Sequence, residues 1–144
     1  MQIKKINDRL FVGSQPTIAD FGEIAAAGIK SIINNRPDDE EPGQPSAQAA
    51  LQAAAAAGLS YSHLPVTGAT ITEDSARRFH DLVENSQEPV LAHCRSGTRS
   101  LTLFAIGEVL AGRMQPGEVR AFGASHGFDL SGAERWLRQK GYEA

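Results

Sequence analysis

A single cysteine, Cys94, lies in the segment of the chain most able to do chemistry. It follows an apolar run, residues 89–92, that is typical of a buried strand, and residues 100–110 carry apolar side chains at helical spacing. A turn between a strand and a helix points successive N–H groups, and the positive end of a helix dipole, at its centre. Because such a field binds anions, it also favours a thiolate. The sequence therefore predicts a reactive cysteine in an anion-binding turn.

The neighbours of Cys94 support this interpretation. Arg95 and Arg99 add positive charge, and Gly97 allows the backbone to bend tightly and expose its amides. A free cysteine is more commonly a small buried hydrophobe, but two arginines and a glycine within five residues favour a functional loop. We expect Cys94 and Arg99 to be catalytic. The expected substrate-binding loop comprises Arg95, Ser96, Gly97, Thr98 and Ser100.

Composition restricts the class of protein. The 144 residues include 41% hydrophobic and 22% charged residues, which fits one compact domain over residues 1–144. The net charge of −3 and the absence of a basic stripe argue against nucleic-acid binding. The sequence contains no apolar segment of signal-peptide or membrane-spanning length, so we expect a cytoplasmic protein that does not bind membranes.

Metal and cofactor sites are not expected. One cysteine cannot form an internal disulfide or a multi-thiolate metal site. His63, His80 and His126 are scattered, and we read none of them as having metal-ligand spacing with a carboxylate or cysteine. Trp136 is most simply a packing anchor on the last helix. If Cys94 carries out transfer chemistry, a second thiol must come from a partner.

The remaining elements must position this turn. Strands are predicted at residues 10–12, 29–34, 59–66 and 89–92, and helices at residues 17–27, 47–57, 72–84, 100–110, 116–124 and 131–140. This alternation predicts an α/β fold with a mainly parallel central sheet flanked by helices. Ligands bind at the carboxyl ends of strands in such sheets. The polar loop at residues 35–45 would then bring Arg36, Asp38 and Asp39 toward Cys94.

Three segments carry a family resemblance: residues 33–38 (INNRPD), 64–66 (LPV) and 93–100 (HCRSGTRS). Together they resemble the phosphatase-like domain family first named for its fusion to beta-lactamase-like hydrolases. The resemblance covers nearly the whole chain and implies a fold similar to that of dual-specificity protein phosphatases. It also implies that His93 supports the thiolate by fixing the loop through hydrogen bonds. Ser100 could donate a hydrogen bond to the sulfur or cap the following helix.

The loop departs from the phosphatase pattern in its length. Dual-specificity phosphatases carry His-Cys-x-x-Gly-x-x-Arg, with five residues between cysteine and arginine, whereas four separate Cys94 from Arg99. The form Cys-Arg-x-Gly-x-Arg is similar to the active-site loop of rhodanese-type sulfurtransferases. One residue fewer contracts the ring of amides, so we expect it to enclose a sulfane sulfur better than a tetrahedral phosphate.

A second departure concerns the general acid. Phosphatases of this fold place an aspartate shortly after the Pro-Val strand end, but residues 67–70 contain no carboxylate. Losing a general acid costs roughly 10²–10⁴-fold in rate. Asp38 or Asp39 could substitute from the other loop, although an acidic run is usually a solvated loop.

Three functions are therefore compatible with the sequence. The favoured one is a sulfurtransferase that carries sulfane sulfur on Cys94 as a persulfide, takes it from a small anionic donor and passes it to an external acceptor thiol. The first alternative is a phosphoester hydrolase acting through a Cys94 phosphocysteine, and the second is a catalytically silent anion-binding regulatory module. The family resemblance implies bacterial sulfide metabolism, with a persulfide-oxidising or sulfide-oxidising enzyme as partner.

Overall fold

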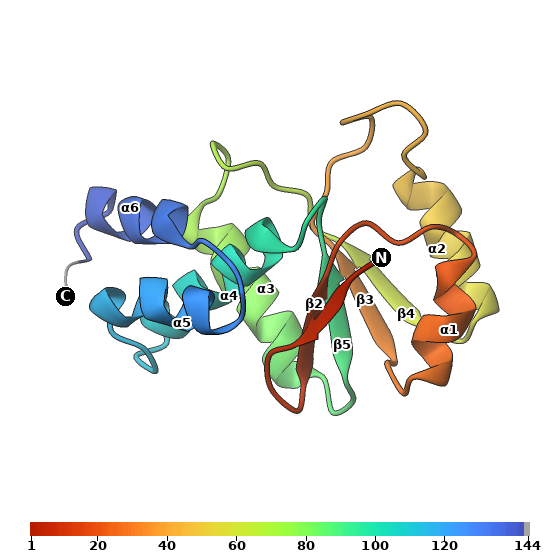
Figure 1. The fold of residues 1–144 in the computed structure, drawn as a ribbon, viewed down its shortest axis with the longest axis horizontal. Coiled ribbons are helices and arrows are strands. Elements are labelled where there is room, and N and C mark those ends of the chain that lie inside the picture. The colour runs from red at the N-terminus through yellow and green to blue at the C-terminus, as the bar shows by residue number, and fades with distance from the viewer. Residues whose placement is uncertain (143–144) are drawn as a thin grey trace.

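Five strands form one sheet in the structure, a computed structural model that describes residues 1–142 (Figure 1). The strands are β1 Ile3–Lys5, β2 Leu10–Gly13, β3 Ser31–Asn34, β4 Ser60–His63 and β5 Val90–His93. They lie in the order β1-β2-β5-β3-β4. Only β1 is antiparallel to its neighbour, while β2, β5, β3 and β4 run parallel. The expected mainly parallel sheet is confirmed.

Helices cover both faces of this sheet (Figure 1). They are α1 Asp20–Ala26, α2 Ala47–Ala56, α3 Glu73–Asn85, α4 Thr98–Leu110, α5 Val119–Ser125 and α6 Ser131–Gln139, with a short 3₁₀ helix, η1 Pro116–Glu118, before α5. Helices α1 and α2 pack on one face, and α3 and α4 lie on the other, where α6 packs on the outer side of α4 and α5 packs against α6. The chain is therefore a three-layer α/β structure.

Strand β5 has the composition of a central strand. All four of its residues are buried, and its parallel neighbours β2 and β3 lie on either side. Alternate side chains serve the two faces: Leu91 packs with α1 and α2, whereas Val90 and Ala92 pack with the larger helical layer. Helix α4 is buried on most of its surface, which explains why it lacks a polar face. The strand and helix that flank Cys94 are thus the best-enclosed elements.

Several element boundaries differ from the sequence prediction. Strand β1 was not predicted because its residues are all exposed and show no alternation of polar and apolar side chains. Strand β4 is shorter than the predicted 59–66 and ends at His63, although the Leu64 N–H still donates to the Asn34 carbonyl of β3 at 2.9 Å. Helix α1 begins at Asp20 rather than at Thr17, whose backbone N–H is bound by the Asp20 carboxylate at 2.7 Å. Helix α4 begins at Thr98 rather than at residue 100.

Parallel pairing brings the carboxyl ends of the central strands to one rim. The loop after β3 is attached to the end of β5 because the Asn35 N–H donates to the His93 carbonyl at 2.8 Å. On the other side, the Gln15 N–H donates to the Arg95 carbonyl at 3.2 Å. Cys94 therefore lies between the loops that follow β2 and β3. None of the described helices combines the length and apolar character needed to cross a lipid bilayer.

Candidate active site

Cys94 follows β5 directly and is almost completely enclosed, with 1% of its surface exposed. The backbone N–H of Gly97 donates to the Cys94 sulfur at 3.0 Å. Gly97 reaches this position with φ 104°, in the left-handed region that favours glycine, and precedes the first residue of α4. A donor at the start of a helix stabilises negative charge on the sulfur. The predicted strand–turn–helix arrangement around Cys94 is present.

Arg99 is held beside the cysteine loop by two acceptors. Its Nη1 donates to the Val66 carbonyl at 3.0 Å and to Glu40 Oε2 at 2.8 Å, and its Nη2 donates to Glu40 Oε1 at 2.9 Å. This two-point bond to Glu40 raises the pKa of Arg99, and the nearby Cys94 sulfur adds to the effect. The guanidinium is thus a fixed positive charge at the nucleophile.

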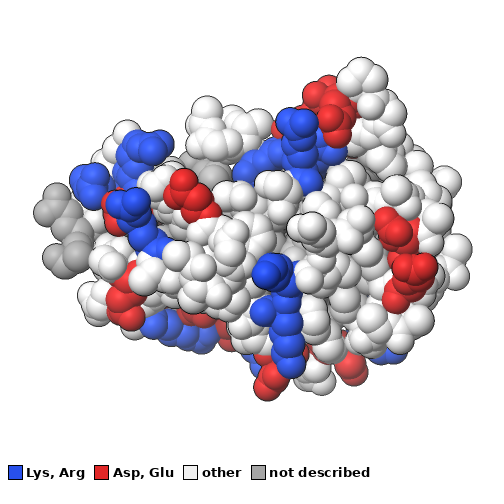
Figure 2. All heavy atoms as spheres, viewed as in Figure 1, with Lys and Arg blue, Asp and Glu red and all other residues white. Residues whose placement is uncertain are grey.

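Two glutamates of the loop after β3 contact all three arginines of the site. Glu40 also accepts from Arg36 Nε at 2.8 Å, while Glu41 lies 3.1 Å from Arg36 Nη2 and 3.6 Å from Arg95 Nη2. The Arg36 side chain is only 1% exposed, whereas that of Arg95 is 69% exposed. Basic and acidic side chains accordingly lie side by side on the surface near this loop (Figure 2).

The charge of Glu40 is fixed by these partners. The hydrogen bond from Arg99, reinforced by the one from Arg36, lowers the pKa of Glu40 to about 2 against the opposing effect of burial. Glu40 is consequently a carboxylate at neutral pH and has no proton to donate. It was not among the predicted site residues, and its place beside Asp38 and Asp39 was the only signal that could have found it.

The structure places Asp38 and Asp39 differently from the expectation. Asp38 Oδ1 accepts from the Ala47 N–H at 2.8 Å, so it binds the first turn of α2 rather than the cysteine loop. Asp39 has φ 64°, and this left-handed turn redirects the chain so that Glu40 reaches the arginines. The loop does supply carboxylates to the site, but they are Glu40 and Glu41.

His93 lies beneath the loop and is buried to 1% exposure. Burial lowers its pKa to about 4, so the ring is neutral at neutral pH. Its Nδ1 lies 3.4 Å from the Cys94 carbonyl oxygen, and Nε2 has no partner among the described residues. The contact to the backbone of Cys94 agrees with a supporting residue.

Ser100 takes neither of the two roles weighed from the sequence. It lies inside α4, so it does not cap that helix, and its hydroxyl donates to Asn35 Oδ1 at 2.7 Å. Asn35 in turn donates from Nδ2 to the Leu64 carbonyl at 2.9 Å. This buried pair ties α4 to the loop after β3. Of the other loop residues, Ser96 Oγ lies 3.3 Å from Thr98 Oγ1.

One group of side chains in residues 1–142 has the composition of a metal site. His80, Glu84 and Glu108 place one ligand atom each within 4.8 Å of one another. The expectation that His80 lacks a suitably spaced carboxylate was wrong, because Glu84 follows it by one helical turn. Arg113 lies 2.6 Å from Glu84 and already supplies positive charge there. The group lies on α3 and α4, outside the cysteine loop.

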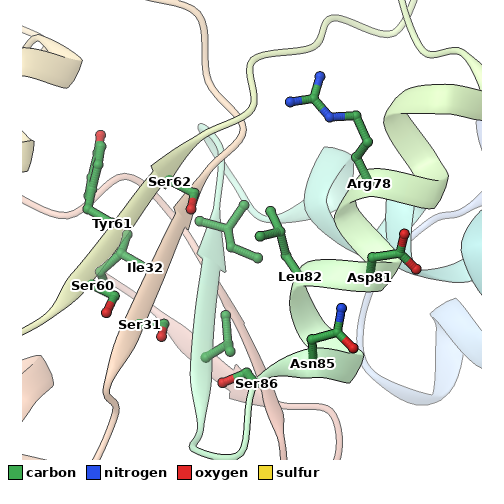
Figure 3. A pocket seen from close by; sticks show the side chains of 12 residues that line it. Ser31, Ile32, Ser60, Tyr61, Ser62, Arg78, Asp81, Leu82, Asn85 and Ser86 are labelled. Carbon is green, nitrogen blue, oxygen red and sulfur yellow. The ribbon is translucent and has the colours of Figure 1, made fainter.

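A groove of about 480 Å³ lies on the larger helical side of the sheet, between α3 and the β3–β4 edge (Figure 3). Small hydroxyl side chains from the strands face Leu82 and Asn85 of α3 across it. None of the residues that line the groove belongs to the cysteine loop. The candidate active site is therefore the Cys94 rim and not this groove.

Comparison with known proteins agrees with this geometry. Residues 2–111 match the profile of a family described as the phosphatase-like domain of the beta-lactamase hydrolase-like protein. The chain belongs to this family. It is 50% identical over 140 residues to the beta-lactamase hydrolase-like protein of Agrobacterium fabrum, and 46% identical to that of Xylella fastidiosa strain Temecula1. Each alignment covers 97% of the chain but only 32% of the relative, so the chain spans about a third of these proteins.

Solved structures show the same fold. A protein of Neisseria meningitidis, provisionally described as a phosphatase, is 35% identical with a TM-score of 0.84, covering 96% of this chain and 98% of its own. A provisionally described phosphatase of Shewanella putrefaciens is 16% identical with a TM-score of 0.74, covering 96% and 89%. PTPMT1 is 14% identical with a TM-score of 0.67, covering 96% and 95%. The predicted cysteine-phosphatase-like fold and family are thus confirmed.

Proposed function

We propose that Cys94 is a nucleophile that receives a sulfane sulfur from a small anionic donor and passes it to an acceptor thiol. The observation that carries this proposal is the state of the carboxylates at the site. Glu40 is an ionised carboxylate bonded to Arg99 and Arg36, and Asp38 is bonded to α2. Among the described residues, the hydrogen bond to the Cys94 sulfur comes from the Gly97 N–H and not from a carboxylic acid. Sulfur transfer needs no such acid, because its leaving group departs as an anion.

The reaction balances with the residues present and an external thiol. The Cys94 thiolate attacks the outer sulfur of a donor such as thiosulfate, a Cys94–sulfur bond forms, and sulfite leaves with the electron pair of the broken sulfur–sulfur bond. An acceptor thiolate then attacks the outer sulfur of the Cys94 persulfide and releases the Cys94 thiolate. The Gly97 N–H, 3.0 Å from the sulfur, stabilises the charge at each stage.

The four-residue spacing between Cys94 and Arg99 supports the same chemistry. A ring of amides with one residue fewer than that of dual-specificity phosphatases offers less space for a tetrahedral phosphate. Arg99 is fixed beside the cysteine loop by Val66 and Glu40. Its positive charge would hold the anionic part of the donor.

Phosphoester hydrolysis is the second candidate, and a specific observation favours it. The Neisseria meningitidis protein with 35% identity is provisionally described as a phosphatase, and the fold is that of the cysteine phosphatases. Likeness to known proteins supports this alternative more directly than it supports sulfur transfer. Cys94 would then form a phosphocysteine that water hydrolyses, without a carboxylic acid to protonate the leaving oxygen.

Intact mass spectrometry separates the two candidates. After incubation with thiosulfate or glutathione persulfide, we expect one added sulfur atom per chain, removed by an acceptor thiol and absent from Cys94→Ser. This variant is a matched control because Cys94 is the only cysteine. No added sulfur, together with Cys94-dependent hydrolysis of an aryl phosphate, would overturn sulfur transfer in favour of phosphatase activity.

A further inference from the structure

The loop after β3 carries a negative charge into the anion site. The Glu40 carboxylate receives three hydrogen bonds, two from Arg99 and one from Arg36. Its side chain is 25% exposed, and the side chain of Arg99 is 20% exposed, so this ion pair is only partly accessible to solvent. Partial exclusion of water strengthens such a two-point pair.

Glu40 and Val66 accept hydrogen bonds from some of the N–H groups of Arg99 and leave the others free of these two partners. A guanidinium has five N–H groups. Both N–H groups of Nη1 are used by Val66 and Glu40, and one N–H group of Nη2 is used by Glu40. The Nε–H and the second Nη2–H form the remaining edge of the guanidinium. An incoming anion therefore binds an arginine whose charge is already balanced by Glu40.

The loop that carries Glu40 is itself braced. Gln44 accepts from the Glu40 N–H at 3.2 Å and donates to the Pro37 carbonyl at 2.8 Å. Asp38 fastens the same loop to the start of α2, and Asp39 supplies the left-handed turn. The position of Glu40 beside Arg99 is thus determined by a loop whose backbone is held in place by hydrogen bonds.

We propose that Glu40 sets the affinity of the Cys94 site for small anions by acting as a built-in counter-ion of Arg99. Glu40 lowers the affinity of the site for every small anion, including the released product and inorganic phosphate. Anions other than the substrate therefore do not stay bound at the site. This inference rests on the proposed anion-binding function of the Cys94 loop and adds a residue that determines its strength.

The test uses inorganic phosphate as the probe and calorimetry on the full chain. In Glu40→Gln an oxygen acceptor remains for Arg99, but the negative charge is gone, so we expect the dissociation constant for phosphate to fall about tenfold. Glu23→Gln is the matched control: it makes the same substitution at an exposed position of α1, and among the described residues Glu23 forms no ion pair with the three arginines. Its dissociation constant should equal that of the wild type.

A second variant guards against misfolding of the first. Glu41 contacts Arg36 and Arg95 but not Arg99, and its side chain is 44% exposed. Glu41→Gln should tighten phosphate binding in the same direction by about twofold to threefold. Unchanged or weaker phosphate binding in both variants would overturn the proposal. Because calorimetry involves no turnover, an absent sulfur adduct beside tighter phosphate binding would overturn the proposed function alone.

Discussion

His93 shows how burial of a single residue makes stability depend on pH. Its pKa of about 4 in the folded protein lies below the value of about 6.5 of an exposed histidine. Between these values the unfolded chain binds a proton that the folded chain does not. Stability therefore falls as the pH falls from about 6.5 to about 4, by on the order of 3 kcal/mol.

Proton NMR of the His93 ring in the folded protein should give its pKa directly. Denaturant unfolding at several pH values should show the accompanying loss of stability. A ring that titrates at or above 6 would contradict this prediction, because burial would then not oppose protonation. The variant His93→Gln, which cannot titrate, should lose the part of the pH dependence that comes from this residue.

Most of the site residues that could be predicted lie close together in sequence; Arg36 is the exception, because ligands bind at the carboxyl ends of parallel strands and this rule brings its loop toward Cys94. The turn around Cys94 and the position of Arg99 follow from local spacing, and the structure brings them together. The link from Ser100 to Asn35 spans 65 positions, so no local pattern reveals it. Glu40 faces the site only because Asp39 adopts a left-handed conformation that its residue type does not require.

At the level of elements, the junction between the cysteine loop and α4 depends on Gly97, which has a left-handed backbone conformation and is closely surrounded by other side chains. A Cβ at Gly97, where φ is 104°, would lie 3.1 Å from Phe128 and 3.1 Å from Val12. We expect Gly97→Ala to destabilise the fold by roughly 2–4 kcal/mol, from left-handed strain plus overpacking. Movement of the Gly97 N–H away from the sulfur should also slow the reaction of Cys94.

Gly112 provides the matched comparison for this prediction. It also has a left-handed conformation, with φ 76°, but a Cβ at this position would meet no other part of the described chain within 4 Å. Gly112→Ala should therefore cost about 1–2 kcal/mol from strain alone. Urea unfolding of both variants measures the difference. Equal losses would show that Phe128 and Val12 move aside without cost.

Periodicity predicted the buried elements well and the exposed ones poorly. The central strands and the helices appear near their expected positions because a buried face imposes a spacing on the sequence. Strand β1 is exposed along its length, so its pairing with β2 is determined by backbone hydrogen bonds that leave no such pattern. The observed start of α1 lies three residues after the predicted one, because the Asp20 carboxylate accepts a hydrogen bond from the backbone N–H of Thr17.

For the whole molecule, the region that matches the family profile ends earlier in the chain than the hydrophobic core does. The family match ends at residue 111, yet Leu130, Trp136 and Leu137 are buried in the same core as α4. Burial of a large apolar side chain contributes about 1.5–3 kcal/mol, and a domain of this size has only about 5–15 kcal/mol of stability. A chain ending at Ala111 should therefore lack a cooperative unfolding transition.

Circular dichroism with denaturant, together with binding of a hydrophobic dye, checks this expectation. Trp136→Phe is the control within the full chain, since it keeps most of the packing and loses the hydrogen bond from Nε1 to the Ile71 carbonyl. It should unfold cooperatively with a loss of about 1 kcal/mol. A shortened chain with the unfolding midpoint of the full chain would show that α5 and α6 are dispensable.

The central position of β5 has a consequence for the timescale on which Cys94 becomes accessible. Its ladders to β2 and β3 must both break before the strand that carries the cysteine can open locally. Such a strand belongs to the slowest-opening unit of a protein, whereas surface loops open at low free energy. Opening of β5 is thus not a route of low free energy to the sulfur, and the nucleophile stays fixed on the sheet.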